Sequence, residues 1–279
     1  MGKLTKQEAI LHRRACELVE LDRPLDEDEA EFVLEHWQES STAANTLDGA
    51  FFTPLGLARD LAIEVVGDRI IDLCAGIGRL AWSCRDVGGR RANHQPPREL
   101  VCVERNPAYV QVGRKVLPEA RWICADIFDL AGTELGQFDT AIGNPPFGVT
   151  SRTGDGPRYR GRRFEYHAID IAADLARHGV FIVPQESAPF RYSGQRCNRW
   201  ERGPEYERFE DQTGIRLRHN CGIDTSGYDD EWRGVSPRTE IVTCDFTGRL
   251  SKTSPPVALV GEQLTLLAPS GLPRAARRC

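Results

Sequence analysis

The residues best placed to do chemistry are Asn144, Pro145, Pro146 and Phe147, which directly follow the apolar run Phe138–Gly143. Two prolines fix the backbone and remove two N–H donors, so the carbonyl groups there are left to accept hydrogen bonds. The Asn144 side chain adds an acceptor, and Phe147 offers a flat face for stacking. This set suits a flat ring that carries an amino group, although a strand followed by a proline-rich turn has the same pattern.

A glycine-containing turn stands earlier in the chain, after the apolar run that ends at Leu73. It contains Asp72, Cys74, Gly76 and Gly78, and the glycines allow a tight turn and close backbone approach to a ligand. The spacing is neither GxGxxG nor GxxxxGK[ST], which disfavours a phosphate cradle. Asp72 could instead pair with a cationic group of a ligand. A structural turn between a strand and a helix is the alternative.

Two further strand-like runs also end in acidic residues. Glu104 closes the second run and could accept hydrogen bonds from both hydroxyls of a ribose. Asp126 follows the third run and could accept from an exocyclic amine, with Ile127 or Phe128 against an adenine face. Each acid alone could be a helix N-cap or a solvated loop residue. Four consecutive strand ends with this chemistry nevertheless indicate one binding site.

The segment Phe51-Phe52-Thr53-Pro54 precedes the glycine turn. Thr53 is predicted to cap a helix over residues 55–66, with Pro54 at its first position. Phe51 and Phe52 could wall a pocket, and an ordinary N-cap with a hydrophobic staple explains them equally well.

An alternation of strands and helices must position these residues. We predict helices near Arg79–Val87, Pro107–Leu117 and Phe164–Ala176, and seven strands at Arg69–Leu73, Glu99–Glu104, Arg121–Ala125, Phe138–Gly143, Gly179–Val183, Ile215–Cys221 and Glu240–Phe246. This alternation predicts an α/β fold with a mostly parallel, Rossmann-like sheet and helices on both faces. The last two strands lack a helix between them and should form an antiparallel hairpin at one edge. Residues 1–47 should form a small helical extension, broken at Pro24.

Together, the segments resemble the class I S-adenosylmethionine-dependent methyltransferases, and specifically the amino-methylating adenine DNA methyltransferases. In that family an FxTP-like segment, a DxCxGxG-like turn, an acidic second-strand end, an Asp after the third strand and NPP[FY] occur in this order. Here they are 51–54, 72–78, Glu104, Asp126 and 144–147. The FxTP segment comes first, as in the gamma arrangement and in modification subunits of restriction systems. The similarity spans residues 48–247, the expected catalytic domain, and the family's sheet has seven strands with an antiparallel last one.

The resemblance implies S-adenosyl-L-methionine as cofactor and assigns roles to residues. Asp72 and the turn from Cys74 through Gly76 to Gly78 would hold the amino acid end. Glu104 would hold the ribose, and Asp126 with Ile127 the adenine moiety, while Phe52 and Thr53 close the methionine side near Asn144. Asn144 and the Pro145 carbonyl would accept hydrogen bonds from the target amine, in a loop fixed by Pro146, and Phe147 would stack on the target ring. No metal is needed.

The loop 151–163 carries five arginines, Arg152, Arg158, Arg160, Arg162 and Arg163, and is rich in glycine. We predict a mobile flap that grips phosphates, with a solvated charged loop as the alternative.

The resemblance implies methylation of the N6 amine of adenine in DNA, by an enzyme of the restriction-modification, phage or orphan type. Adenine methylation of RNA, methylation of a protein glutamine and a non-catalytic binding protein stay as alternatives. Gamma-type enzymes usually carry a recognition domain after the catalytic part, which here is reduced to residues 186–214 and a short tail. Either site choice is minimal, or a partner such as a separate specificity subunit supplies it, or the substrate is RNA with its own shape.

The composition fits this assignment without singling out a substrate. The chain has 279 residues and a net charge of −5, which does not by itself favour nucleic acid. It has no apolar run long enough to span a membrane and no apolar leader at its start. The nine cysteines form no CxxC pair and no zinc spacing, so we expect reduced thiols in a cytoplasmic protein. The tail 248–279 is proline- and arginine-rich and is expected to be weakly ordered.

Overall fold

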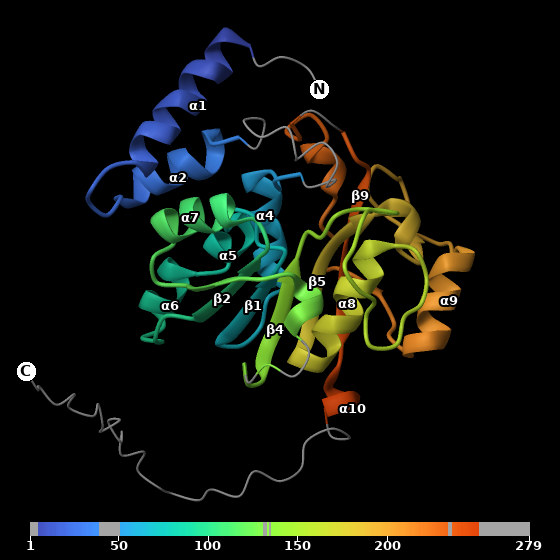
Figure 1. Ribbon diagram of the computed structural model, residues 1–279. Coiled ribbons are helices and arrows are strands. Elements are labelled where there is room, and N and C mark those ends of the chain that lie inside the picture. The colour runs from blue at the N-terminus through green and yellow to red at the C-terminus, as the bar shows by residue number, and fades with distance from the viewer. Residues whose placement is uncertain (1–4, 39–50, 131–132, 134, 234–235, 251–279) are drawn as a thin grey trace, which may run out of the picture.

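The protein is seen here as a computed structural model that describes residues 5–38, 51–130, 133, 135–233 and 236–250. In this part of the chain, seven strands form one sheet in the order β3-β2-β1-β4-β5-β9-β8 (Figure 1). The strands are β1 (Arg69–Leu73), β2 (Glu99–Glu104), β3 (Arg121–Cys124), β4 (Phe138–Gly143), β5 (Ala176–Pro184), β8 (Arg218–His219) and β9 (Thr239–Asp245).

The strand directions confirm the predicted fold class. Strands β1 to β5 pair in parallel, whereas β9 runs antiparallel to both β5 and β8. The predicted strand Ile215–Cys221 shrinks to the two residues of β8. The cause lies in the backbone donors before it: Ile215 N–H donates to Thr213 Oγ1 and Leu217 N–H to Tyr206 Oη, so neither joins a ladder. The sheet therefore ends at a short edge strand.

The apolar residues of each central strand alternate between two cores, as a sheet covered on both faces requires. Ile70 of β1 and Val180 of β5 pack in one core, while Ile71 and Phe181 pack in the other. The first core includes residues of α4 (Leu55–Leu61), α5 (Arg79–Ser83) and α7 (Pro107–Val116). The second includes residues of α8 (Phe164–Leu175) and α9 (Pro204–Thr213). The predicted helices on both faces are thus confirmed.

Several shorter elements complete the described chain: η2 (Ala62–Glu64), α6 (Val87–Ala92), η3 (Ile127–Leu130), η4 (Gln185–Ser187), η5 (Thr225–Tyr228) and α10 (Thr247–Leu250). The predicted helix Arg79–Val87 divides into α5 and α6 because Asp86, with φ of +47°, leaves the right-handed helical region between them. Among the described helices, none is both long and apolar enough to cross a membrane. The predicted tail lies almost wholly outside the described residues.

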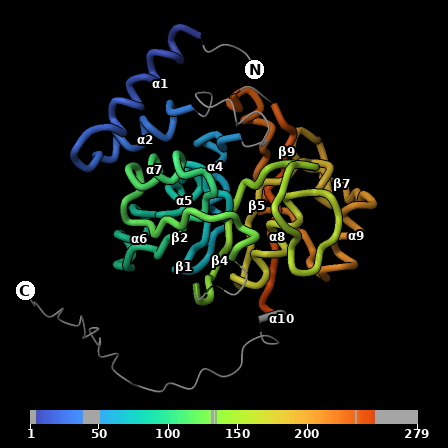
Figure 2. The backbone as a smooth tube through the Cα atoms, in the orientation of Figure 1, coloured from blue at the N-terminus to red at the C-terminus, as the bar shows by residue number. Residues whose placement is uncertain are grey.

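The N-terminal extension consists of α1 (Lys6–Val19) and α2 (Glu27–His36), as predicted, and packs on the α7 side of the sheet (Figure 2). The acidic run starts α2 through a capping box in which Asp26 accepts from the Glu29 N–H. Arg85 pairs with Glu27 at 2.7 Å. The extension is therefore packed against the helices that cover this face of the sheet.

The segment between β5 and β8 contains structure that the sequence pattern did not predict. A two-stranded ribbon, β6 (Phe190–Arg191) with β7 (Arg199–Trp200), is followed by α9. Helix α9 begins with Pro204 at its first position and ends at Gly214, whose φ is +62°. This ribbon-and-helix insertion stands at the carboxyl end of β5.

Candidate active site

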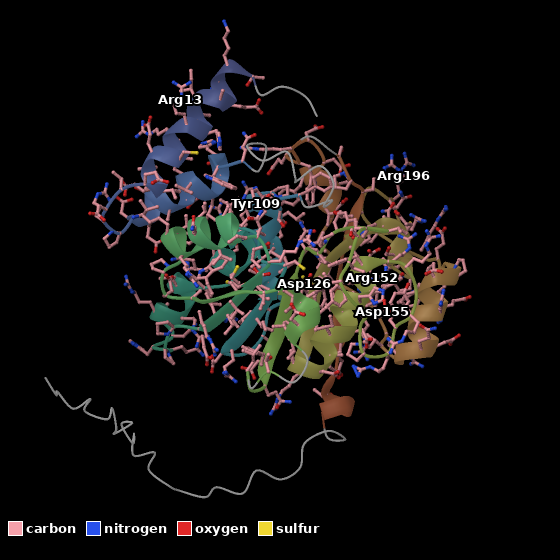
Figure 3. All side chains as sticks on the ribbon, in the orientation of Figure 1. Arg13, Tyr109, Asp126, Arg152, Asp155 and Arg196 are labelled. Atoms are coloured by element: carbon pink, nitrogen blue, oxygen red, sulfur yellow. The ribbon has the colours of Figure 1, made fainter. Side chains whose placement is uncertain are left out.

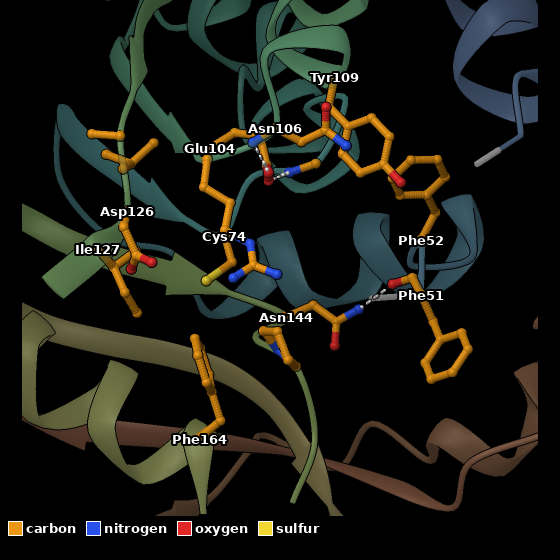
Figure 4. Close-up of a pocket in the computed structure, with 15 residues that line it drawn as sticks. Phe51, Phe52, Cys74, Glu104, Asn106, Tyr109, Asp126, Ile127, Asn144 and Phe164 are labelled. Atoms are coloured by element: carbon orange, nitrogen blue, oxygen red, sulfur yellow. Dashed lines mark hydrogen bonds between the residues drawn. The ribbon is translucent and has the colours of Figure 1, made fainter. Parts of the chain in front are cut away.

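A cleft lies at the carboxyl ends of the parallel strands, where the strand order reverses between β1 and β4. It encloses about 680 Å³ of empty space including its open mouth. Figure 4 shows side chains from several strand ends converging on it. The lining residues are Phe51, Phe52, Cys74, Gly76, Val103, Glu104, Arg105, Asn106, Tyr109, Ala125, Asp126, Ile127, Asn144, Pro146 and Phe164.

The glycine turn forms one wall of the cleft. Cys74 and Gly76 adopt φ of +64° and +58°, so the chain turns sharply as it leaves β1. A Cβ on Gly76 would stand 3.0 Å from the Phe52 ring, which means that a side chain here would fill the cleft. Gly78 is not among the lining residues: it precedes α5, where a Cβ would stand 3.1 Å from the Trp122 ring.

Glu104 joins this turn to the end of β2. Its carboxylate accepts the Gly76 N–H at 2.9 Å and the Asn106 N–H at 2.8 Å. Burial raises the pKa of Glu104 above its ordinary value, and these backbone donors offset part of that rise. A carboxylate held in this way at the cleft wall can still accept hydrogen bonds through its remaining lone pairs, as the predicted ribose contact requires.

Asp72 does not lie in the cleft, contrary to its predicted contact with the ligand. Its carboxylate is 1% exposed and accepts the Ala81 N–H of α5 at 3.2 Å, while Oδ1 has no hydrogen-bond partner. Burial raises the pKa of Asp72 well above its ordinary value. Because side chains alternate along a strand, Asp72 shares the face of Ile70 and points under α5.

Asp126 and Ile127, predicted to contact an adenine moiety, line the opposite part of the cleft. The Asp126 carboxylate accepts the Phe128 N–H at 3.2 Å and the Thr153 hydroxyl at 3.1 Å. Ile127 is 3% exposed and supplies an apolar surface. Phe128 points elsewhere: its ring packs edge-on against Phe164 at 5.6 Å, and Phe164 lines the cleft instead.

The Asn144 side chain is held in one orientation. Its Nδ2 donates to the Phe51 carbonyl and to Thr53 Oγ1, both at 3.0 Å. Its Oδ1 is buried and has no hydrogen-bond partner (Figure 4). A buried acceptor without a partner costs free energy unless a ligand donor meets it. Asn144 Oδ1 is therefore an acceptor that a donor group of a ligand in the cleft could satisfy.

Thr53 was predicted to cap the following helix, and that prediction is wrong. The N-cap of α4 is Pro54, and no side chain caps it. The Thr53 hydroxyl accepts from Asn144 instead, and the buried Arg79 guanidinium donates to the Thr53 carbonyl at 3.0 Å and lies over the Phe52 ring. The segment before α4 is thus shaped to hold the asparagine.

The rest of the Asn-Pro-Pro-Phe segment is divided between cleft and core. Pro145 is buried and Pro146 lines the cleft. Phe147 is half-buried and packs with the apolar cluster that contains Phe51 and Phe52, but it is not among the residues lining the cleft. Its predicted stacking face therefore lies beside the cleft rather than within it.

The arginine loop is not a free phosphate-gripping flap. Arg158 bonds Asp170 at 2.8 Å and Asp174 at 2.6 Å on α8, and Arg163 donates to Ser187 Oγ at 2.9 Å and lies 3.4 Å from Glu165. Two more arginines are engaged inside the loop: Arg152 with Asp155 at 2.9 Å, and Arg160 with backbone carbonyls, including that of Pro157. Arg162 is exposed, and no ion pair engages it within the described residues.

Buried polar groups of α8 explain why this loop is fixed. His167 Nδ1 accepts the Gly156 N–H at 2.9 Å, so its Nε2 carries the proton and donates to the Gly161 carbonyl at 3.1 Å. Asp170 accepts the N–H groups of Arg158 and Tyr159 at 2.6 and 2.8 Å. Since both side chains are fully buried, the loop covers α8 as a structural element.

The structure also adds residues to the predicted set. Asn106, Tyr109 and Phe164 line the cleft, together with Phe51, which the sequence already suggested as a pocket wall. Asn106 follows the predicted Glu104 by two residues, which is the signal that could have found it. Tyr109 and Phe164 lie in the first turns of helices, where nothing in the local pattern separates a cleft residue from a core residue.

The fold is an open α/β sheet with a cleft at its switch point. No known protein family and no curated protein matches the sequence. Solved structures match the fold. The methyltransferase subunit of a type I restriction-modification system from Streptococcus thermophilus has a TM-score of 0.51 at 15% identity, over 78% of this chain and 48% of that chain. A Listeria monocytogenes protein described as a class I S-adenosylmethionine-dependent methyltransferase has a TM-score of 0.53 at 11% identity, over 87% and 81%.

The chain therefore has the class I methyltransferase fold, with the Rossmann-like sheet that the sequence predicted. It spans about half the length of the restriction subunit that it matches. At these identities the likeness concerns the fold, so activity and substrate must be argued from the cleft.

Proposed function

We propose that the chain is an S-adenosylmethionine-dependent methyltransferase that methylates the exocyclic N6 amine of adenine in DNA. The observation that carries the proposal is the fixed Asn144 side chain, whose buried Oδ1 has no partner. A primary aromatic amine is a donor that fits this acceptor.

The cleft fits the proposed cofactor. Both Glu104 and Asp126 line the cleft. In this proposal Glu104 would accept hydrogen bonds from the ribose hydroxyls, and Asp126 would accept one from the exocyclic amine. Because Gly76 has no side chain, it leaves room for a ligand beside Phe52. When bound, S-adenosylmethionine supplies an electrophilic methyl group on a sulfonium sulfur.

The contribution of this chain is alignment and electrostatics. The lone pair of an aromatic amine is delocalised into its ring, which makes the nitrogen a poor nucleophile. Two acceptors, Asn144 Oδ1 and the Pro145 carbonyl, would draw the amine hydrogens out of the ring plane and so favour a pyramidal nitrogen. Because Phe51 and Thr53 already hold the asparagine, this acceptor needs no reorganisation during the reaction. Formation of the N–CH3 bond would break the S–CH3 bond of the sulfonium, leave a neutral thioether and release one amine proton to solvent.

The choice of adenine in DNA rests on the order of the sequence motifs and on the methyltransferase subunit of a DNA restriction-modification system among the structural neighbours. An adenine in duplex DNA would have to leave the stack, at a cost of a few kcal/mol. RNA adenine presents the same aromatic amine, and protein glutamine presents an amide NH2 group whose lone pair is also delocalised, so an experiment must separate these alternatives.

The test is a methyl-transfer assay with labelled S-adenosylmethionine and three substrates: duplex DNA, structured RNA and protein. The expected product is N6-methyladenine in DNA, identified by mass after digestion. Label in methylated glutamine, or in RNA alone, would contradict the substrate assignment while leaving the methyltransferase assignment intact. Binding of the cofactor without transfer to any of the three would support a non-catalytic binding protein.

A further inference from the structure

The ribbon β6–β7 carries a basic and aromatic surface that the cleft does not use. Residues 190–202 contain four arginines and one glutamate, a local charge of +3 (4 − 1) on a chain whose net charge is −5. Arg191 is engaged with Glu201 at 2.8 Å, and Arg202 with Glu210 at 2.8 Å. The other two arginines, Arg196 and Arg199, are exposed and make no ion pair within the described residues.

Two neighbouring groups extend this surface. Arg238, at the start of β9, is also exposed and unpaired within the described part of the chain. Trp200 is 64% exposed, although its ring edge rests on Phe190 and His219 at 6.1 and 6.2 Å. An exposed tryptophan among unpaired arginines is unusual for a surface that meets only water, because its ring adds apolar area without burying it. Aromatic rings and free guanidinium groups together are what single nucleic-acid strands bind.

A polar hollow of about 400 Å³ lies between the ribbon tip and η5. Gly194 and Gln195 of the tip line it on one side, with Ser226 and Asp229 opposite and Arg238 beside them. The lining offers an amide, a hydroxyl, a carboxylate and a guanidinium, and so presents both donors and acceptors. Such groups suit the edge of a nucleobase, where donors and acceptors alternate.

Buried carboxylates fix this surface next to the cleft. Glu240 is fully buried and accepts the Tyr192 N–H and the Gln185 Nε2–H, both at 2.8 Å. Glu165, also fully buried, accepts the Gly148 N–H at 2.8 Å and the Ser187 hydroxyl at 2.7 Å. Glu165 therefore links Gly148, in the loop after Asn144, to Ser187, in the segment that leads into the β6–β7 ribbon.

The sheet places both sites at the same edge. Strands β4 and β5 are neighbours, with Gly143 opposite Phe181, and adjacent strands lie about 4.8 Å apart. Asn144 follows β4, and Gln185 follows β5. A strand of nucleic acid with its target base at Asn144 could therefore run on across the ribbon. In Figure 3, Arg196 lies at the outer edge of the molecule on the right of the view, whereas Arg13 of α1 lies at the upper left.

We propose that the β6–β7 ribbon, through Arg196, Arg199 and Trp200, together with Arg238 just before β9, binds the nucleic-acid strand beside the target nucleotide. Arginines would contact phosphates, Trp200 would stack on a base, and the polar hollow would take the edge of another base. The inference rests on the proposed function, because it assumes that the substrate is nucleic acid. It gives the short segment between β5 and β8 the role of a recognition element.

The test measures the affinity of two triple variants of the whole chain for fluorescent nucleic acids. The ligands are single-stranded DNA, duplex DNA and RNA, and each affinity is measured over a series of salt concentrations. One variant is Arg196→Gln, Arg199→Gln, Arg238→Gln. The matched control is Arg13→Gln, Arg91→Gln, Arg121→Gln, which removes three exposed arginines elsewhere. The first should flatten the slope of log affinity against log salt by about two to three, whereas the control should leave the wild-type slope nearly unchanged.

Trp200→Ala should weaken binding by about 5- to 150-fold, as expected for loss of one stacked base, and Trp200→Phe should restore most of it. Circular dichroism and thermal melting of each variant separate lost binding from lost folding. The inference is overturned if wild type binds and methylates an oligonucleotide and the ribbon variant matches it in affinity and salt slope. If wild type binds S-adenosylmethionine but neither binds nor methylates DNA or RNA, the proposed substrate fails, and this inference with it. The DNA and RNA arms identify which strand the surface takes.

Discussion

Nδ2 of Asn144 lies 3.0 Å from Oγ1 of Thr53, a residue 91 positions earlier in the chain. This contact joins the end of β4 to the segment before α4 and turns the other end of the amide, Oδ1, into a buried acceptor without a partner. The orientation of the proposed catalytic amide is therefore set by a side chain that the reaction does not touch.

Thr53→Val keeps the shape of the side chain but removes the acceptor. The amide of Asn144 then keeps only the Phe51 carbonyl, and we expect kcat to fall about tenfold, the equivalent of one hydrogen bond. The dissociation constant for S-adenosylhomocysteine should change little. Thr53→Ser, which restores the hydroxyl, should recover activity. Equal turnover in the valine and serine variants would show that Thr53 does not position the amide.

Glu104→Gln tests the cofactor wall. The change removes the charge and one acceptor from a group that meets Gly76 and Asn106, and we expect affinity for S-adenosylhomocysteine, measured by calorimetry, to fall about 10- to 100-fold. Glu99→Gln is the matched control, because Glu99 starts the same strand but is exposed and paired with Arg69. Similar affinities for the two variants would remove Glu104 from the site.

The stability of the arginine loop should depend on pH through His167. Burial lowers the pKa of His167 below its ordinary value near 6.5, so the unfolded chain binds this proton more readily than the folded chain. The neutral ring therefore contributes stability above pH 6.5, and that contribution is lost as the pH falls through 6.5 towards the lower folded pKa.

His167→Gln can accept from Gly156 and donate to Gly161 without titrating. The difference between the unfolding free energies of wild type and this variant should be constant above pH 7 and shift against wild type below pH 6.5. Chemical denaturation at a series of pH values measures it. The variant comparison cancels the contributions of His12 and His36, whose pKa values burial also lowers. Parallel curves at all pH values would contradict the assignment.

Arg158 and Arg162 lie in the same loop but should behave differently. Arg158→Ala removes two ion pairs and leaves the fully buried Asp170 with backbone donors alone, so we expect a loss of about 2–3 kcal/mol in unfolding free energy. Arg162→Ala, at an exposed position, should change it by less than about 0.5 kcal/mol. Equal stability of the two variants would mean that the loop is not anchored through Arg158.

The strand ends could be predicted from the sequence because apolar runs and the acids after them are local signals. Asp72 lies behind the turn because side chains alternate in β1. The sequence contains this signal, but an acid next to a glycine turn suggested a ligand contact instead. The engagement of Arg158 depends on Asp170 and Asp174, which stand one helical turn apart on α8 and face the loop only after folding.

The β6–β7 ribbon had no comparable signal. Its strands are two residues each, and they pair across a polar turn, so no period-two pattern can develop. Its position depends on the buried Glu240 and Glu165, and both accept hydrogen bonds from residues far away in the sequence. Contacts of this kind are tertiary, and a single sequence does not display them.

The central claim is that Asn144 directs methyl transfer to an adenine amine, and Asn144→Ala tests it most directly. Methylated adenine in DNA is measured by mass under single-turnover conditions, alongside calorimetric binding of S-adenosylhomocysteine. Loss of a preorganised acceptor predicts that the rate falls at least about 10²- to 10³-fold while cofactor affinity stays within a few-fold of wild type. Methylation of adenine at the wild-type rate by the Asn144→Ala variant would contradict the account.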